Sequence, residues 1–288
     1  MKVWIDGAIV PASEARVPVL DHGLLYGDGV FEGIRAYGRA VFRLDDHLAR
    51  LATSAKAIGL ALPHPIEAIR GIVLDTLRAL GRDDAYVRLV VTRGVGALGV
   101  DPTTCPVPTL FCLAAEAQIY PPEKLASGLD LVTVSVRRPA LDAVDPRVKS
   151  LNYLNNALAK QEARARGADE ALILNAAGSV AEASVANVFA LTGRALATPP
   201  PTDGALAGIP RRSVLELAPG LGLAGGERSL SRVDLLGADE VFLTGTGAGL
   251  VPVRSLDGQP IGAGEPGPVF AKTRAAFLAL TKTLGVPF

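Results

Sequence analysis

Cysteine is scarce in this sequence, and neither sign of charge predominates. The 288 residues include two cysteines, Cys105 and Cys112, and no third cysteine or nearby histidine completes a zinc-binding set. We therefore expect reduced thiols and no metal site, as in a cytoplasmic protein. Lysine plus arginine and aspartate plus glutamate number 29 each. This balance gives no reason to expect nucleic acid or an anionic membrane as a partner.

Long apolar runs are also missing. No uncharged apolar stretch approaches the roughly 20 residues that a membrane-spanning helix needs, and Asp6 lies where a signal peptide would have its apolar region. Hydrophobic residues nevertheless make up 49% of the chain and charged residues 20%, which is typical of a globular protein. We expect a soluble, cytoplasmic protein of one large domain or two smaller ones.

The first part of the chain combines short hairpins with two helices. Periodicity and turn residues predict strands at 3–5, 8–10, 34–37, 40–43, 85–92 and 109–115. They predict helices at 46–58 and 65–80. Asp45 is the predicted cap of the first helix, and Gly81 ends the second. The segment 21–33, rich in glycine and acidic residues, is predicted as a loop.

The second part begins again with a strand. Its predicted strands are 131–137, 170–174, 179–184, 186–192, 240–243 and 250–253, and its predicted helices are 152–166, 210–217 and 269–284. The prolines Pro121 and Pro122 mark a linker at 118–127. We expect a mixed α/β or α+β fold with a small domain at 1–117 and a larger domain at 128–288.

Two charged residues lie where a pocket would need them. Lys149 sits in a loop between a strand and a helix, and a lysine in a pocket can form a Schiff base with a carbonyl cofactor. Glu182 lies in a strand of small and apolar residues, where a buried acid would pair with a protonated ring nitrogen. Taken alone, the local sequence favours a solvated lysine and a solvent-facing glutamate.

Other segments are suited to anions. The helix that opens near Pro210, the glycine run Thr244-Gly245-Thr246-Gly247-Ala248-Gly249 and the helical Arg50 are each candidates for a phosphate. Tyr86 and Arg88 are two residues apart on one strand, so they project to the same face and can bind a carboxylate. Each of these signals is weak alone. The alternative for each residue is a side chain on the exposed surface that binds no ligand.

These pieces occur together and in order in one family. The chain resembles the class IV, fold-type IV pyridoxal-phosphate aminotransferases, which share the two-domain fold of D-amino-acid aminotransferase, and it is most similar to the branched-chain amino-acid aminotransferases. The segments that carry the resemblance are Tyr26–Arg35, Lys149–Tyr153, Glu182 with Asn187–Phe189, Gly208–Ile209 and Asp239–Thr246.

The resemblance implies a role for each candidate residue. Lys149 would be the catalytic lysine that carries pyridoxal 5'-phosphate as a Schiff base, and Glu182 would hold the pyridine nitrogen protonated. Tyr153 would donate a hydrogen bond to the ring hydroxyl. The phosphate would be bound by Arg50, the Ile209 amide and Thr246, and 128–288 would be the cofactor-binding domain.

The resemblance also implies a substrate pocket and an oligomer. The pocket would be lined by Tyr26, Phe31, Tyr86, Arg88, Val100, Thr246 and Gly247. Arg88 would bind the distal carboxylate of glutamate, and the amides of Thr246 and Gly247 would bind the α-carboxylate. The segment with Gly99 and Val100 resembles a loop that closes the neighbouring subunit's site, so we expect a homodimer or a higher homo-oligomer. The partners are amino acids and keto acids, with no nucleic acid and no membrane.

Three positions depart from the family pattern. Pro210 replaces a usual threonine, so up to two phosphate hydrogen bonds are lost. Val185 replaces a glycine close to the expected cofactor and would narrow the pocket. Gly249 stands where glutamate is usual. These departures bear on the preferred substrate and on cofactor affinity.

The activity that the resemblance implies is transamination of L-leucine, L-isoleucine or L-valine with 2-oxoglutarate. Two alternatives on the same fold are a D-amino-acid aminotransferase, against which the Tyr86 and Arg88 pair argues, and a 4-amino-4-deoxychorismate lyase, which needs no amino acceptor. A cofactor-binding protein without activity would require Lys149 or Glu182 to be idle.

Overall fold

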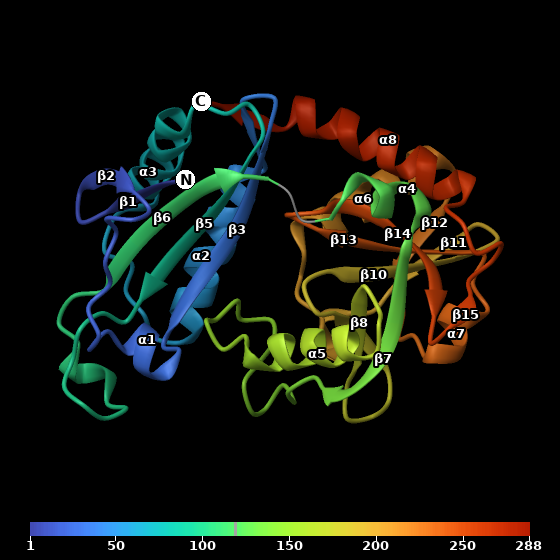
Figure 1. The fold of residues 1–288 in the computed structure, drawn as a ribbon, viewed down its shortest axis with the longest axis horizontal. Coiled ribbons are helices and arrows are strands. Elements are labelled where there is room, and N and C mark those ends of the chain that lie inside the picture. Colours follow the sequence, from blue (N-terminus) through green and yellow to red (C-terminus); the bar gives the residue numbers. More distant parts are fainter. Residues whose placement is uncertain (118–119) are drawn as a thin grey trace. The chain divides into compact units, whose positions relative to one another are not determined.

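The structure is a computed structural model that describes residues 1–117 and 120–288, and it divides into two compact units (Figure 1). Unit 1 comprises Met1–Ala117 with two later segments, Val148–Asn152 and Thr281–Phe288, and unit 2 holds the rest of the described chain. The predicted linker begins with residues 118 and 119, which lie outside the described residues, and its remainder includes helix α4 (Pro122–Ser127). Within the described ranges, no helix is long and apolar enough to cross a membrane.

Unit 1 is built on one antiparallel sheet with helices packed on it. The strand order is β16-β4-β3-β5-β6-β1-β2. The strands are β1 (Lys2–Ile5), β2 (Ala8–Pro11), β3 (Gly29–Tyr37), β4 (Ala40–Phe42), β5 (Ala85–Thr92), β6 (Thr109–Glu116) and β16 (Gly285–Pro287). The helices are α1 (His22–Tyr26), α2 (Leu44–Ala57) and α3 (Ile66–Leu80). Helix α2 packs on β3, and α3 packs on β1, β5 and β6.

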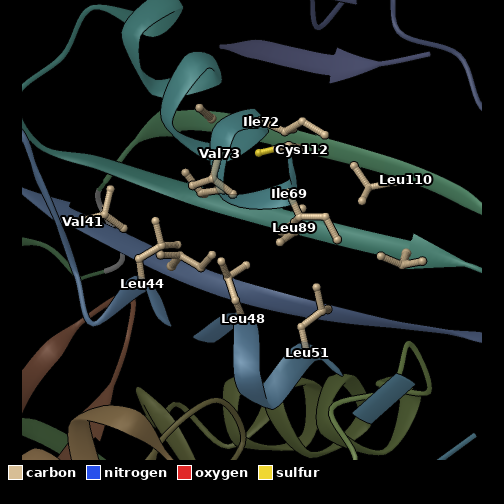
Figure 2. Packing of buried hydrophobic residues seen from close by; sticks show 14 of the residues in the cluster. Val41, Leu44, Leu48, Leu51, Ile69, Ile72, Val73, Leu89, Leu110 and Cys112 are labelled. Carbon is tan, nitrogen blue, oxygen red and sulfur yellow. The ribbon is translucent and has the colours of Figure 1, made fainter. Parts of the chain in front are cut away.

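An aliphatic core holds these layers together (Figure 2). Helix α2 contributes Leu44, Leu48 and Leu51 at helical spacing, and all three are fully buried. Helix α3 and the sheet add Ile69, Ile72, Val73, Val41, Leu89, Leu110 and Cys112. Burial of each such leucine stabilises the fold by about 1.5–3 kcal/mol. The core therefore holds β3 and α2, which carry several candidate residues, in a fixed position relative to each other.

Unit 2 is built on a mixed sheet with the order β12-β11-β10-β13-β14-β7-β8-β9, with β15 paired to β14. Its strands are β7 (Leu129–Arg137), β8 (Glu170–Leu174), β9 (Val180–Ala183), β10 (Asn187–Thr192), β11 (Ala195–Thr198), β12 (Ala224–Glu227), β13 (Glu240–Gly245), β14 (Gly249–Leu256) and β15 (Gln259–Pro260). Its helices, besides α4, are α5 (Leu154–Ala165), α6 (Ile209–Leu217), α7 (Arg232–Leu236) and α8 (Pro268–Thr283). The last three residues of α8, from Thr281 on, are assigned to unit 1. Helix α5 packs on β7 and β8, and α6 packs on β13.

Most predicted elements are confirmed to within a few residues. The strands predicted at 85–92 and 170–174 have those bounds as β5 and β8. Gly81 ends α3 with a left-handed backbone of φ 70°, as predicted for a glycine that follows a helix. The C-terminal strand β16, which pairs with β4, is an addition that the sequence analysis missed.

The prediction of a loop over 21–33 is wrong. Asp21 caps a short helix, because its Oδ1 accepts a hydrogen bond from the Gly23 amide at 2.8 Å. Gly27 ends that helix with φ 69°. Strand β3 then begins at Gly29. Glycine and acid content indicated a loop, but Gly27 ends the short helix and Gly29 and Gly33 lie in β3. The acidic residue in that strand, Glu32, is buried and paired.

Two predicted helix starts differ from the observed starts by two residues. Helix α2 begins at Leu44 after Arg43, which has a left-handed φ of 48° and no capping side chain. Asp45 therefore lies in the first turn and is not the cap. Helix α5 begins at Leu154. Asn152 belongs to unit 1, where its Nδ2 donates to the carbonyl of Gly27 at 3.1 Å.

Candidate active site

The segment that contains Lys149 lies beside the start of β3 within unit 1. The Phe31 amide donates to the Lys149 carbonyl at 3.0 Å, and the Leu151 amide donates to the Gly29 carbonyl at 2.9 Å. The Lys149 amide donates to Ser54 Oγ on α2 at 3.2 Å. Both backbone groups of Lys149 are therefore hydrogen-bonded, which fixes the point from which its side chain extends.

The Lys149 amine reaches an aromatic ring that also contacts an arginine. Lys149 Nζ lies 4.5 Å from the centroid of the Phe31 ring, and Arg88 Cζ lies 4.3 Å from the same centroid. Strand register explains the second contact, because Gly33 pairs with Arg88 and Phe31 is two residues from Gly33 on the same face. A primary amine and a guanidinium thus share one apolar surface, an arrangement suited to an anionic ligand.

Tyr86 lies on the same face of the sheet, over a glycine. A Cβ atom built on Gly33 would come within 2.3 Å of Tyr86 Oη. Gly33 therefore leaves the space that the phenol occupies. The predicted same-face placement of Tyr86 and Arg88 on β5 agrees with this geometry.

On the opposite face of β3, the buried Glu32 pairs with two side chains of α2. Arg50 donates from Nε to Oε1 at 2.7 Å and from Nη2 to Oε2 at 2.8 Å, and His47 Nδ1 lies 2.7 Å from Oε2. Burial alone would raise the pKa of Glu32, but the charge and hydrogen bonds of Arg50, together with His47, lower it to about 2. Burial lowers the pKa of His47 against the opposing effect of Glu32. Glu32 is therefore ionised beside a neutral His47 at neutral pH.

In unit 2, Glu182 is held by a buried polar network. Oε1 accepts from Arg138 Nη2 at 2.5 Å, and Oε2 accepts from Asn187 Nδ2 at 2.9 Å and from the Leu206 amide at 3.0 Å. Arg138 Nη1 also donates to Asn156 Oδ1 at 3.2 Å. The expectation of a buried, paired carboxylate agrees with this environment.

The N-terminus of α6 is held close to the same network. Its first residue is Ile209, with Gly208 as the cap, so Pro210 is the second helical residue. Asn187 Nδ2 donates to the Leu206 carbonyl at 2.8 Å. A Cβ on Gly208 would meet Asn187 Oδ1 at 2.0 Å, so a larger residue there would displace the Asn187 side chain. The Ile209 amide is thus placed at a helix N-terminus, where anions are stabilised.

The glycine run joins β13 to β14 in a tight turn. Gly245 pairs with Gly249, which leaves Thr246, Gly247 and Ala248 in the turn. Gly249 has φ 70°, a left-handed conformation that a glutamate would adopt only with strain. A glutamate at position 249 would therefore be strained in this backbone. Among the described residues, the buried Thr244 Oγ1 has no hydrogen-bond partner.

The loop after β5 is fixed to α1. The Gly99 amide donates to Tyr26 Oη at 2.8 Å, and His22 Nε2 lies 2.9 Å from the Ala97 carbonyl. The side chain of Val100 is 78% exposed. Tyr26 and Val100 thus belong to one surface of unit 1, and Val100 is available to another molecule.

Unit 1 brings together Phe31, Arg88 and Lys149, and unit 2 brings together Glu182 and the residues beside the Ile209 amide. Sequence reasoning missed Arg138, His47 and Asn156. No local signal singled out Arg138, because it follows another arginine, Arg137, at the end of β7. Val185 is 58% exposed, and its effect on a bound cofactor stays a prediction.

Comparison with known proteins shows similarity over nearly the whole chain. Residues 29–256 match the family described as amino-transferase class IV. A protein of Methanocaldococcus jannaschii named putative branched-chain-amino-acid aminotransferase is 45% identical over 99% of this chain and 98% of its own length. The similarity therefore covers both units.

Solved structures agree in fold. The crystal structure of the Escherichia coli branched-chain amino acid aminotransferase has a TM-score of 0.94 and 35% identity, and covers 97% of this chain and 94% of the other. The branched-chain amino acid aminotransferase from Thermobaculum terrenum, solved in its PLP-form, has a TM-score of 0.88 and 30% identity, with coverage of 99% and 97%. The fold-type IV architecture expected from the resemblance is confirmed.

Proposed function

We propose that this chain, which belongs to the class IV aminotransferase family, transfers the amino group of L-leucine, L-isoleucine or L-valine to 2-oxoglutarate. The observation that carries the substrate class is the contact of Lys149 and Arg88 with the ring of Phe31. The two substrates of such a reaction differ in kind, because one side chain is apolar and the other ends in a carboxylate. An apolar ring beside a single guanidinium suits both.

Pyridoxal 5'-phosphate is the cofactor that we propose. When bound, it supplies a carbonyl carbon that condenses with amines and a ring that accepts electron density from the substrate Cα. Two features of unit 2 fit such a group. The Glu182 carboxylate is held by three donors and suits a protonated ring nitrogen. Thr244, which pairs with Asn187 across β10 and β13, has a buried hydroxyl without a partner among the described residues.

Each candidate residue of the site then has a proposed role. The Lys149 amine binds the cofactor covalently and moves the proton at the substrate Cα. Glu182 accepts a hydrogen bond from the ring nitrogen, and Tyr153 donates one to the ring hydroxyl. The phosphate ligands are Arg50, the Ile209 amide and Thr246. Pro210, the second residue of α6, has no amide to offer, so this helix N-terminus contributes fewer donors.

The proposed substrate pocket combines apolar and anion-binding groups. Its residues are Tyr26, Phe31, Tyr86, Arg88, Val100, Thr246 and Gly247. Arg88 binds the distal carboxylate of glutamate, while the amides of Thr246 and Gly247 bind the α-carboxylate. Phe31 and Val100 contact the branched side chain.

A homodimer is part of this proposal. Apolar side chains gather on α1 and the loop after β5, where Leu24 is 64%, Leu98 is 79% and Val100 is 78% exposed. Exposed apolar side chains concentrated in one region favour an interface. The hydrogen bond between Tyr26 and Gly99 would fix the segment with Val100, which we propose closes the neighbouring subunit's site. A location in the cytoplasm stays a prediction from the sequence.

Steady-state assays with three substrate sets test the proposal. We expect L-glutamate to form from L-leucine as donor and 2-oxoglutarate as acceptor, with little reaction when D-leucine or D-alanine replaces the donor. Release of pyruvate from 4-amino-4-deoxychorismate without an amino acceptor would instead identify a lyase. Turnover of the D-amino acids with none of the L-branched donors would contradict the proposed specificity and retain the family.

A further inference from the structure

Glu32 is a carboxylate in an otherwise aliphatic row of β3. The alternate residues Val30, Ile34 and Ala36 belong to the apolar core of unit 1, and each is at most 1% exposed. Glu32 occupies the same row and is 0% exposed. An ionised carboxylate in such surroundings is strongly unfavourable unless it is paired and hydrogen-bonded. Glu32 therefore needs a charged partner that pairs with it inside the core.

Arg50 is that partner, and the pair has a defined geometry. Nε and Nη2 of Arg50 donate to the two oxygens of Glu32 at 2.7 and 2.8 Å. Two parallel bonds of this kind hold the guanidinium in the plane of the carboxylate. His47, one helical turn before Arg50, contacts Oε2 at 2.7 Å. Because Nε and Nη2 face Glu32, Nη1 is directed away from the carboxylate.

A buried ion pair is by itself weak evidence for a role in stability. Replacement of a buried ion pair by apolar residues is often neutral or stabilising. The exposure of the two partners differs, since the side chain of Glu32 is 0% exposed and that of Arg50 is 14% exposed. The Glu32 carboxylate is thus fully buried, whereas the Arg50 guanidinium is partly exposed at the border of the core.

We propose that Glu32 is a positioning residue that holds the Arg50 guanidinium in the orientation in which it binds the phosphate of the cofactor. This inference rests on the proposed function, in which Arg50 is a phosphate ligand. His47 supports the carboxylate through Oε2 and does not contact the phosphate. Glu32 strengthens phosphate binding although its own negative charge repels the phosphate, because the fixed orientation of the Arg50 guanidinium contributes more than this repulsion costs.

Orientation and charge give opposite expectations for Glu32→Gln. The substitution removes a negative charge close to Arg50, and if charge governed, phosphate would bind more tightly. If orientation governs, the amide accepts only one of the two Arg50 hydrogen bonds, and the guanidinium is no longer fixed. The affinity for a phosphate-bearing cofactor should then fall on the order of tenfold, as for the loss of one charge-assisted hydrogen bond.

The experiment titrates the full-length protein, freed of cofactor, with pyridoxal 5'-phosphate and separately with pyridoxal, and follows the visible absorption. We expect Glu32→Gln to weaken binding of pyridoxal 5'-phosphate about tenfold and to leave binding of pyridoxal unchanged. Unchanged or tighter binding of pyridoxal 5'-phosphate would overturn the inference. Equal losses for both ligands would also overturn it, because they indicate a general disturbance of the fold.

Two further variants separate the possible causes. His47→Gln alters the same cluster from the same helix and leaves both Arg50 hydrogen bonds to Glu32 in place, so its effect should be much smaller. A loss equal to that of Glu32→Gln would contradict a role through Arg50. In the Arg50→Lys background, adding Glu32→Gln should cause no further loss, and additive losses would contradict the inference.

Arg50→Lys also distinguishes this inference from the proposed function. If it leaves the preference for pyridoxal 5'-phosphate over pyridoxal unchanged, the phosphate role of Arg50 fails and the role of Glu32 fails with it. If Arg50→Lys reduces that preference and Glu32→Gln does not, the inference about Glu32 alone is wrong.

Discussion

Replacing Arg88 with methionine should separate the two halves of the transamination cycle. Arg88 Cζ lies 4.3 Å from the centroid of the Phe31 ring, and Lys149 Nζ lies 4.5 Å from it. A substrate whose Cα is held at Lys149 therefore extends its side chain along a surface that ends in the guanidinium. Methionine keeps an unbranched apolar chain against Phe31 and removes the charge.

The expected magnitude follows from the bond that is lost. A charge-assisted hydrogen bond contributes about 1.5–3 kcal/mol, so the second-order rate constant for L-glutamate should fall by roughly 10- to 150-fold. L-Leucine has no distal carboxylate, and its apolar side chain meets methionine without a desolvation cost. Its rate constant should change by about threefold or less, which corresponds to well under 1 kcal/mol.

Single-turnover measurements test this prediction. The loss of the visible absorption band of the bound cofactor is followed after mixing with L-glutamate or L-leucine, with no keto acid present. Arg39→Met is the matched control, because Arg39 lies in the turn between β3 and β4 with its Cζ 5.3 Å from the Phe288 ring, outside the strand face that carries Phe31. We expect the control to preserve the ratio of the two rate constants. Equal losses for both donors in Arg88→Met would refute a role in binding the distal carboxylate.

Two further predictions concern the sheet of unit 1. Gly33→Ala places a Cβ 2.3 Å from Tyr86 Oη and displaces the phenol, so KM for L-leucine should rise. The control Gly71→Ala in α3 has open space around it, so it should leave KM unchanged and raise stability by about 0.5–1 kcal/mol. Equal KM values in the two variants would contradict the placement of Tyr86. The lowered pKa values of His47 and Glu32 predict that stability falls as pH drops below about 6.5, where unfolded His47 takes up a proton, and again from about 4.5 towards 2 as Glu32 protonates. Urea unfolding at several pH values checks this, and a profile in His47→Gln that is as steep between pH 6.5 and 5 as in the unchanged protein would contradict it.

Local signals predicted many elements of this fold. Glycine after a periodic apolar segment located the end of α3 at Gly81, and the apolar run of β8 located both of its ends. These features depend on interactions within a few residues, so the sequence records them directly. The resemblance also singled out Lys149, Glu182 and Arg88, whose surroundings in each unit suit the tasks it implies.

Interactions between distant segments account for what was missed. The start of β3 resembled a loop because Glu32 finds its partners 15 and 18 residues later, on α2. Arg138 meets Glu182 across 44 positions of the chain. The segment with Lys149 joins unit 1 although the chain on both sides of it belongs to unit 2. No local pattern records such pairings, because they exist only after the sheets have formed.

The visible absorption spectrum, recorded before and after one addition of excess L-leucine without keto acid, shows whether this chain transaminates an L-branched-chain amino acid. We expect the band of the Lys149-bound cofactor to disappear and the band of the pyridoxamine form to grow. Lys149→Ala should show neither the initial band nor the change. A spectrum that L-leucine leaves unaltered would contradict transamination of L-branched-chain amino acids, and a Lys149→Ala variant that retained both would contradict the role of Lys149.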